Sequence, residues 1–437
     1  MNDFRPMREM PNLKNFGPND TLVIFGEVFD RGYVNGLVQE AQQKNMKIIF
    51  STVGRRDQED QLRSLTVDEL SQKGQTPLIN IPLEAGFDLS PCSADHTTPC
   101  DQLKGVKLTQ WDNVQLDWQK INSSRENGMS DFRTRVNQWV EELSKVLSAS
   151  GHVVFAHTMA GGVPRAKIVL PLLNRVFKGY GDRFMDSYEF WSSEIGKLCS
   201  KSFFDVTAQT FFHLIDQTHE MRQQRQANGF NVSYVAYGYH GTELLINNKM
   251  QWQSYSPYLQ GFAKLELENI AKKAWSEGIH ATVFNAPEIL TNSSSVFLGI
   301  EVAVYPLISA LKKELGQHSL LEEIESQLKE YLKPDCNLNQ ILTLTDEYYQ
   351  SDVVKDWSQY ANWPQHNGPE QMKLMRETSQ KIIQMHRDSK FMLTEQLSEI
   401  IFKACGKIML NEAHLPQNPV WWIGHDIVAK ATKSGLE

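Results

Sequence analysis

Residues 21–56 read TLVIFGEVFDRGYVNGLVQEAQQKNMKIIFSTVGRR and carry the clearest structural signal in the chain. An apolar run is followed by glycines, then by residues with helical spacing, then by a second apolar run. This order predicts a strand, a turn, a helix and a second strand. Such a unit of about 30 residues is the repeating element of a parallel sheet with helices on both faces. We therefore expect an α/β protein with a doubly wound parallel sheet.

Later apolar runs continue this pattern, at residues 76–83, 151–162, 231–241 and 278–291. The last three each follow a helical stretch, so strand and helix alternate to about residue 315. The third and fourth strands are separated by roughly 70 residues, which is too long for a simple crossover. We therefore expect an insertion at about 83–128, after the third strand. Helical spacing from Ser319 onward predicts a helical C-terminal extension, giving a main domain at 1–330 and an extension at 331–437.

Composition indicates a folded protein and excludes some partners. Apolar residues make up 41% of the chain and charged residues 22%, as in globular proteins. The net charge of −8, with no basic run, gives no attraction to a phosphate backbone, so nucleic acid is not expected. The most apolar window, residues 295–311, is interrupted by Glu301 and Pro306 and is shorter than a membrane span of about 20 residues. We expect a buried or lid helix there and no stable membrane insertion.

The first residues and the cysteines bear on the compartment. Charges and prolines interrupt the start of the chain, which lacks the apolar run of a secretory signal. The five cysteines form no CxxC pair, which is typical of thiols in a reducing compartment. Both features predict a cytoplasmic protein. Cys92, His96 and Cys100 are close in sequence, but no fourth ligand stands at a standard spacing, so no metal is expected.

The first predicted turn contains Gly26, Gly32 and Gly36. A dinucleotide-binding turn needs glycine because the chain bends tightly and the pyrophosphate approaches the backbone beside a helix N-terminus. The spacing differs from GxGxxG, so an ordinary strand-to-helix turn remains the alternative. Arg55 and Arg56 follow the second strand, where an arginine accommodates the 2′-phosphate of NADP. This pattern favours NADPH, with NADH possible, and a solvated basic turn is the alternative.

The segment QSYSPYLQGFAKLELENIAKKAWSE, residues 253–277, places two tyrosines before a lysine. Its Ser-Pro pair predicts a helix start. Tyr258 would then lie about 120° from Lys264 around the helix axis, whereas Tyr255 precedes the helix and is not bound to its phase. A tyrosine is a poor proton donor near neutral pH unless a cation assists it, and Lys264 could supply that charge. Tyr255 is the preferred donor and Tyr258 its rival, while ordinary packing residues with a surface lysine remain the alternative.

The order of these motifs resembles the short-chain dehydrogenase/reductase superfamily. A glycine turn follows the first strand, FAHTMAGG (155–162) the fourth and AYGYHGTE (236–243) the fifth, and a Tyr/Lys pair marks the next helix. Eight residues separate Tyr255 from Lys264, as in the long enoyl-acyl-carrier-protein and trans-2-enoyl-CoA reductases, whereas ordinary members have three. The stretch from Tyr239 to Tyr255 is about six residues longer than usual in these reductases. The segment ILTNSSSVFLGIEVAVYPLISALKKELG (289–316) is similar to their cofactor-contacting threonine and serine run and substrate helix.

The resemblance implies a Rossmann fold of the short-chain dehydrogenase type and assigns roles to residues. Tyr255, with Tyr239 beside it, would stabilise an enolate, and Lys264 would hold the nicotinamide ribose. The cofactor cleft would be shaped by Gly26, Gly32, Gly36, Thr158, Ala160 and Thr291, with Arg55 or Arg56 on a 2′-phosphate. Residues 295–311 would cover the acyl chain.

The implied reaction is NAD(P)H-dependent reduction of the 2,3 double bond of an enoyl thioester, with hydride added at C3. Acyl carrier protein or coenzyme A would present the acyl group, and the enzyme would serve fatty acid biosynthesis. Two alternatives remain open at this point. One is a carbonyl reductase of the same superfamily acting on a 3-ketoacyl thioester. The other is a noncatalytic subunit that binds a nucleotide or an acyl carrier protein.

Overall fold

The computed structural model describes residues 5–12, 16–239, 241–253, 259–292, 294–358 and 366–436. Within these residues, seven parallel strands form the central sheet in the order β11-β10-β7-β6-β1-β2-β5. The strands are β1 (Thr21–Phe25), β2 (Lys47–Thr52), β5 (Leu78–Pro82), β6 (Val153–His157), β7 (Val232–Gly238), β10 (His280–Asn285) and β11 (Val420–Trp422). The predicted doubly wound parallel sheet is therefore confirmed.

The strands in the middle of the sheet are apolar on both faces. All residues of β1, β6 and β7 are buried, as expected for a parallel sheet covered by helices on both sides. The chain leaves β1 toward β2 on one side and later returns to β6 on the other. Phe25 pairs with His157, so the turns after β1 and β6 lie side by side. Ligands of such sheets bind at this point, outside the carboxyl ends of the strands.

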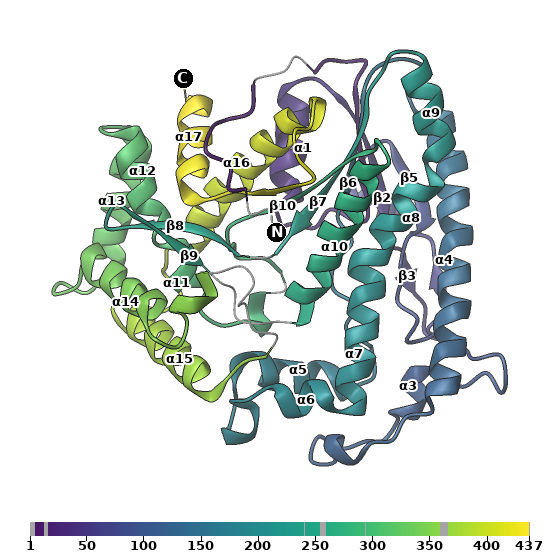
Figure 1. Cartoon of the computed structure of the whole chain (residues 1–437), viewed down its shortest axis with the longest axis horizontal. Helices are drawn as coiled ribbons and strands as arrows, with labels where there is room; N and C mark the ends of the chain where they lie inside the picture. Colours follow the sequence, from purple (N-terminus) through teal and green to yellow (C-terminus); the bar gives the residue numbers. More distant parts are fainter. Residues whose placement is uncertain are drawn as a thin grey trace.

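One face of the sheet is covered by α1 and α16, which share a core with the other helices from the last third of the chain, drawn in green to yellow in Figure 1. These are α1 (Val34–Gln43), α11 (Ile300–Val304), α12 (Leu307–Leu315), α13 (Ser319–Tyr331), α14 (Leu338–Gln350), α15 (Pro369–Gln384), α16 (Thr394–His414) and α17 (His425–Leu436). The C-terminal region is helical, as expected, but it also supplies β11. Residues on both sides of position 330 share one hydrophobic core, so the expected domain boundary there separates no core.

The opposite face is covered by α4 and the helices before and after β7 (Figure 1). These are α4 (Trp118–Val146), α8 (Thr210–Gln217), α9 (His219–Ala227) and α10 (Leu259–Ser276). A third core joins residues 87–121 to α5 (Val169–Lys178), α6 (Tyr188–Ser192) and α7 (Glu194–Phe204). The expected insertion at 83–128 is seen as an irregular segment with α3 (Pro99–Gln102) and η1 (Trp111–Asn113), but it ends at Asp117, where α4 begins the crossover.

Smaller elements complete the structure. They are the hairpins β3 (Arg55–Arg56) with β4 (Leu62–Arg63) and β8 (Thr242–Ile246) with β9 (Lys249–Gln253), the helix α2 (Val67–Lys73), the 3₁₀ turns η2 (Asp182–Phe184), η4 (Ser294–Val296) and η5 (Lys355–Ser358), and the π-helical turn η3 (Asp205–Gln209). The sequence interpretation missed the β8–β9 hairpin. Asn247 and Asn248 at its tip both have positive φ, the conformation of a two-residue hairpin turn. This hairpin occupies the stretch between Tyr239 and Tyr255.

The apolar window 295–311 is buried as predicted. It runs through η4 and α11 into α12, and Val302, Tyr305 and Ile308 are fully buried in the core of the first face. Among the described residues, no helix combines the length and the apolar character that a membrane crossing requires.

Two glycines allow α1 and α16 to pack in close contact. A Cβ atom on Gly36 would lie 1.8 Å from the carbonyl oxygen of Phe402, and one on Gly406 would lie 2.1 Å from the backbone of Gly36. Gly36 was expected to shape a cofactor cleft. The structure gives it another role, because it faces α16 and is needed for the close approach of two helices.

Gly36→Ala should therefore destabilise the fold. The added methyl group overlaps backbone atoms of α16, and overpacking of this kind costs about 1–3 kcal/mol or more. Gly17→Ala is the matched control, since a Cβ there would meet nothing within 4 Å. Urea unfolding of both variants measures the difference. Equal midpoints for the two variants would contradict the close helix contact.

Candidate active site

A cavity of about 260 Å³ opens at the carboxyl ends of β1, β6, β7 and β10. Its wall contains six of the residues predicted from the sequence: Gly32, Thr158, Ala160, Tyr239, Lys264 and Thr291. It also contains side chains that the sequence interpretation did not assign, among them Glu27, Tyr33, His157 and Glu288. The fold thus brings together residues that are up to about 260 positions apart in the chain.

The turn after β1 bends where the sequence placed its first glycine. Gly26 has φ of +130°, and a Cβ there would lie 2.2 Å from the hydroxyl oxygen of Thr158. That hydroxyl donates a hydrogen bond to the carbonyl of Phe25 at 3.1 Å, which joins the turns after β1 and β6. A Cβ on Gly32 would meet nothing within 4 Å, so there is open space beside the N-terminus of α1. This space suits a pyrophosphate held by helix N–H groups.

The π-helical turn η3 holds the turn after β6. Thr207 exchanges two hydrogen bonds with the backbone of Gly161, at 3.1 and 3.2 Å. Thr210 lies 2.8 Å from Nε2 of His157 and donates its own hydroxyl hydrogen to the carbonyl of Val206. Burial, together with the charge of Lys264, lowers the pKa of His157 to about 3, so this imidazole is neutral. Such π-helical turns often occur at functional sites.

Lys264 lies on α10 with its side chain buried against the end of β7. Its ammonium group donates a hydrogen bond to the carbonyl oxygen of Tyr237. Burial lowers the pKa of Lys264 to about 8, because the charged form loses hydration. The ammonium group therefore lies at the cavity wall. Neutral pH is close to its pKa, so the charge of Lys264 is sensitive to small changes in its surroundings.

Tyr239 and Glu288 form a pair across the cavity. The phenol of Tyr239, just after β7, donates to Oε2 of Glu288, three residues after β10, at 2.8 Å. Burial raises the pKa of Glu288 to about 8, and the hydrogen bond from Tyr239 offsets only part of this rise. Glu288 was missed, although an acidic residue directly after an apolar strand in a predicted parallel sheet was a readable signal. Tyr255 and Tyr258, the predicted donor and its rival, lie outside the described residues.

Tyr33 crosses from the N-terminus of α1 to the other side of the site. Its hydroxyl donates to the carbonyl of Pro287, and its ring stacks on that of Tyr237 with centroids 5.5 Å apart. Thr291 and Ser294 close the wall beyond Glu288, with the Thr291 N–H donating to the Ser294 hydroxyl at 2.6 Å. The small residue before Tyr239 also has a structural reason, because a Cβ on Gly238 would lie 2.3 Å from the side-chain oxygen of Asn285.

The two arginines after β2 are both engaged with carboxylates. Arg55 forms an ion pair with Glu27 at 2.9 Å, and Lys73 approaches the same carboxylate at 2.7 Å. Arg56 pairs with Glu84 at 2.5 Å. Neither arginine lines the cavity. The sequence predicted that one of them meets a 2′-phosphate; in the structure both form ion pairs with carboxylates, and Arg55 shares the single charge of Glu27 with Lys73.

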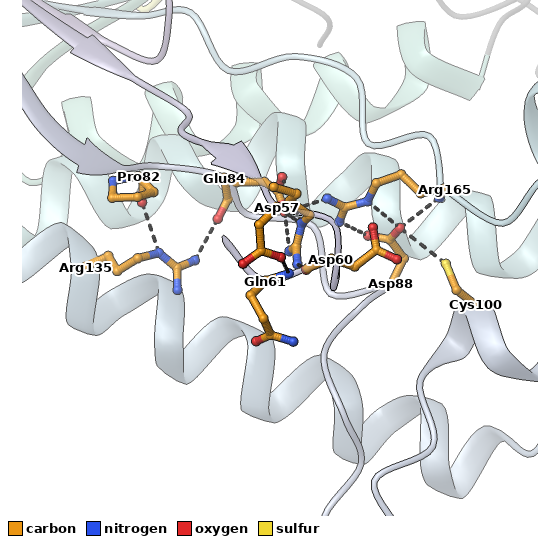
Figure 2. Close-up of polar contacts among 10 residues, drawn as sticks. Asp57, Asp60, Gln61, Pro82, Glu84, Asp88, Cys100, Arg135 and Arg165 are labelled. Carbon is orange, nitrogen blue, oxygen red and sulfur yellow. Dashed lines mark hydrogen bonds and ion pairs between the residues drawn. The ribbon is translucent and has the colours of Figure 1, made fainter. Parts of the chain in front are cut away.

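Glu84 also belongs to a polar network that reaches the inserted segment, shown in Figure 2. Arg165 contacts Glu84 at 2.7 Å and also binds Asp88 through its Nε at 2.9 Å. Arg135 on α4 donates to the backbone carbonyls of Pro82 and Glu84 (Figure 2). Cys100 donates its thiol to Asp88 at 3.5 Å, so this cysteine belongs to the same polar network (Figure 2). The network fixes the insertion beside the turn after β6.

A parallel sheet of this order, with a glycine turn, an open helix N-terminus and a buried lysine at its carboxyl edge, is typical of dinucleotide-binding enzymes of the Rossmann type. Comparison with known families narrows this class. The family described as enoyl-acyl carrier protein reductase FabMG matches residues 3–432. The chain belongs to this family and is an enoyl reductase, an oxidoreductase that acts on CH–CH bonds. Membership in a family of enzymes excludes the alternative of a noncatalytic binding subunit. The family match gives no support to the alternative of a carbonyl reductase.

Two solved structures match the whole chain. One is an apo structure of FabMG, with 41% sequence identity, a TM-score of 0.93, and coverage of 100% of this chain and 99% of that chain. The other is an NADH-bound structure of FabMG, with 37% identity, a TM-score of 0.77 and full coverage of both chains. A trans-2-enoyl-CoA reductase of Treponema denticola in complex with NAD matches at 14% identity and a TM-score of 0.34, over 88% of this chain and 84% of that one. This similarity is too low to indicate a shared function. Comparison with curated proteins gives no match.

The buried carboxylate of Glu27 predicts a pH-dependent contribution to stability. Burial alone would raise its pKa, but hydrogen bonds from Arg55, Lys73, Thr52 and the N–H of Val53 outweigh this and lower the pKa to about 2. Because the folded-state pKa is depressed from 4.5, the stabilisation is complete above about pH 4.5 and is lost as the pH falls toward 2. Glu27→Gln should lose about 2–3 kcal/mol of unfolding free energy at pH 7.

The measurement is urea unfolding at pH 7 and at pH 3–4. We expect the difference between Glu27→Gln and wild type to shrink as the pH falls. Glu59→Gln, at an exposed position on the neighbouring hairpin, is the control and should follow wild type throughout. A difference that is the same at every pH would show that the Glu27 charge is not the source.

Proposed function

We propose that the chain reduces the 2,3 double bond of an enoyl group carried on acyl carrier protein, with NADH as the reductant. The carrier protein is named by the family description and by both FabMG structures. The observation that carries the proposal is the position of Lys264, buried at the carboxyl edge of the sheet in the wall of a cavity that also contains Tyr239. A fixed cation and a phenol together stabilise negative charge that develops on a carbonyl oxygen.

NADH rather than NADPH is proposed for two reasons. The FabMG structure with a bound cofactor contains NADH. In this chain, Arg55 is held by Glu27 and Arg56 by Glu84, and neither arginine lines the cavity, which argues against a contact with a 2′-phosphate. Gly26 would shape the cleft by letting the turn after β1 approach Thr158, and Gly32 would leave room for the pyrophosphate at the N-terminus of α1. Thr158, Ala160 and Thr291 would line the rest of the cofactor cleft.

When bound, the nicotinamide supplies the hydride, which we assign to C3 of the enoyl group. As the hydride arrives, negative charge moves to the thioester oxygen. Tyr255, with Tyr239 beside it, would hydrogen-bond that oxygen. Lys264 would hold the nicotinamide ribose and favour the ionised form of the neighbouring phenol by its charge. The assignment of Tyr255 rests on its spacing from Lys264. The segment 295–311 would border the acyl chain through Phe297, which lines the cavity.

Substitution at the tyrosines and the lysine tests this mechanism. With crotonyl-acyl carrier protein and NADH, Tyr255→Phe and Lys264→Ala should each lower kcat about 100-fold or more, as is typical when acid–base or charge-stabilising groups are lost. Tyr258→Phe, with the same chemical change three residues away, should retain turnover. The readout is the absorbance of the reduced cofactor. Loss in Tyr258→Phe with retention in Tyr255→Phe would reverse the tyrosine assignment.

The cofactor preference has its own test, in the double variant Arg55→Gln/Arg56→Gln. Because both arginines are engaged with carboxylates, the ratio of kcat/KM for NADH over NADPH should change less than about threefold, although unfolding stability should fall. If an arginine bound a 2′-phosphate, kcat/KM with NADPH would drop at least about tenfold, the usual effect of removing a charged hydrogen bond. That drop would restore the preference for NADPH predicted from the sequence.

A further inference from the structure

The carboxyl group of Glu288 stands out among the groups that line the cavity. Its side chain is 9% exposed, and within the described part of the chain it forms no ion pair. Its hydrogen-bond partner is the phenol of Tyr239 at 2.8 Å. A carboxylate buried without a cation is costly, so the group keeps its proton instead. With a pKa raised to about 8 by burial, Glu288 is mostly protonated at neutral pH.

Reduction of an enoyl thioester consumes one proton as well as one hydride. The group that meets the thioester oxygen must therefore regain a proton after each turnover. Two tyrosines are proposed to meet that oxygen, and we assign the proton transfer to Tyr239 and a second hydrogen bond to Tyr255. Tyr239 suits this role because it lines the cavity and its phenol contacts Glu288. Glu288 itself also lines the cavity, and water that enters the cavity can return a proton to it.

We propose that Glu288 is the proton reservoir of the reaction, giving its proton to Tyr239 as Tyr239 gives its own to the substrate. This rests on the proposed function. In the step, a hydride enters at C3 with its electron pair, and the former π pair moves toward the thioester oxygen. The O–H bond of Tyr239 breaks and its proton passes to that oxygen. Once the Tyr239 hydroxyl has turned to the substrate, the Glu288 O–H donates to the phenolate, which takes its proton, and the carboxylate takes one from water. The enol formed in this way then gains a proton at C2 while its oxygen returns one to water, so that one hydride and one proton are consumed overall.

Other titratable groups face the same cavity and could affect its pH dependence. They are Glu27 after β1, Arg31 and Tyr33 before α1, His157 on β6, Tyr237 on β7 and Lys264 on α10. His157 is neutral and Glu27 ionised across the neutral range, because their pKa values are about 3 and about 2. Burial raises the pKa of Tyr237 well above its ordinary value. Lys264, with a pKa of about 8, is therefore the group that must be separated from Glu288 by experiment.

Glu288→Gln makes this separation. The amide keeps a carbonyl oxygen as acceptor for the Tyr239 phenol and has nearly the same volume, but it carries no transferable proton. Wild-type kcat with crotonyl-acyl carrier protein and NADH should fall above about pH 8. Glu288→Gln should lower kcat roughly 10- to 100-fold at pH 7, with little change in KM, because the amide cannot return a proton to Tyr239. Some activity should remain, since water can still transfer a proton to Tyr239 slowly. If Glu288 causes the high-pH decline, the variant should show none, whereas a decline due to Lys264 would remain and would overturn the proposal.

A double variant adds a second criterion. If Glu288 acts through Tyr239, the variant Tyr239→Phe/Glu288→Gln should be no slower than Tyr239→Phe alone. If the loss of kcat in the double variant equalled the product of the losses in the two single variants, the two side chains would act independently. That result would also overturn the relay. Glu412→Gln is the matched control, since Glu412 is another buried glutamate with a raised pKa but lies outside the cavity wall. It should keep the wild-type pH profile.

The protonation of Glu288 can be measured without turnover. Infrared difference spectra of the protein without added nucleotide, recorded between pH 6 and 10, should show a carboxylic acid C=O band that disappears near pH 8. The band should be missing in Glu288→Gln and present in Glu412→Gln. Wild type that shows the band but fails to reduce enoyl thioesters would refute the proposed function alone. The proposed role of Glu288 would be refuted if the wild-type enzyme were active but lacked the band. It would also be refuted if Glu288→Gln had the same kcat as wild type.

Discussion

The rest of the structure depends on one constraint, which is that a parallel sheet with apolar residues on both faces must be covered twice. The strands β1, β6 and β7 are buried throughout, so neither face can meet water. One face is closed by helices from the first half of the chain together with α10, but the other needs α1 and the C-terminal helices together. The contact between Gly36 and α16 follows from this, because α16 must lie close over α1 to complete the cover. What the sequence presented as an extension is part of the core.

The same burial sets the electrostatic character of the cavity. Parallel strands end on one edge, and the side chains that follow them are enclosed by the turns on either side. Burial moves Lys264 and Glu288 to pKa values of about 8 and makes His157 neutral. Of the cation–carboxylate pairs Arg55–Glu27 and Arg56–Glu84, only Glu27 lines the cavity. The cavity wall thus combines an ionised carboxylate that is already engaged in an ion pair with groups whose charge depends on burial.

The sequence predicted features that follow from local pattern and missed those that depend on distant contacts. Apolar runs located the strands of the central sheet up to β10, and the need for a tight turn located Gly26, where the structure shows a positive φ. The short strand β11 was missed because three residues beside a helical region give no periodic signal. The carboxylates that engage Arg55 and Arg56 come from other turns, so no local spacing could reveal them. The position of Glu288 near the end of an apolar run was readable, but its raised pKa was not, since the pKa depends on burial in the folded structure.

The position of α16 and β11 in the chain also affects how the protein is made. Gly36 and Gly406, which touch in the folded structure, are separated by about 370 residues in sequence. At a synthesis rate of about 5–20 residues per second, roughly 20–70 s pass between the two leaving the catalytic centre of the ribosome. During that time one apolar face of the nascent sheet has no permanent cover. The growing polypeptide is then a natural client for holdase chaperones, and its release in a folded form waits for the final helices.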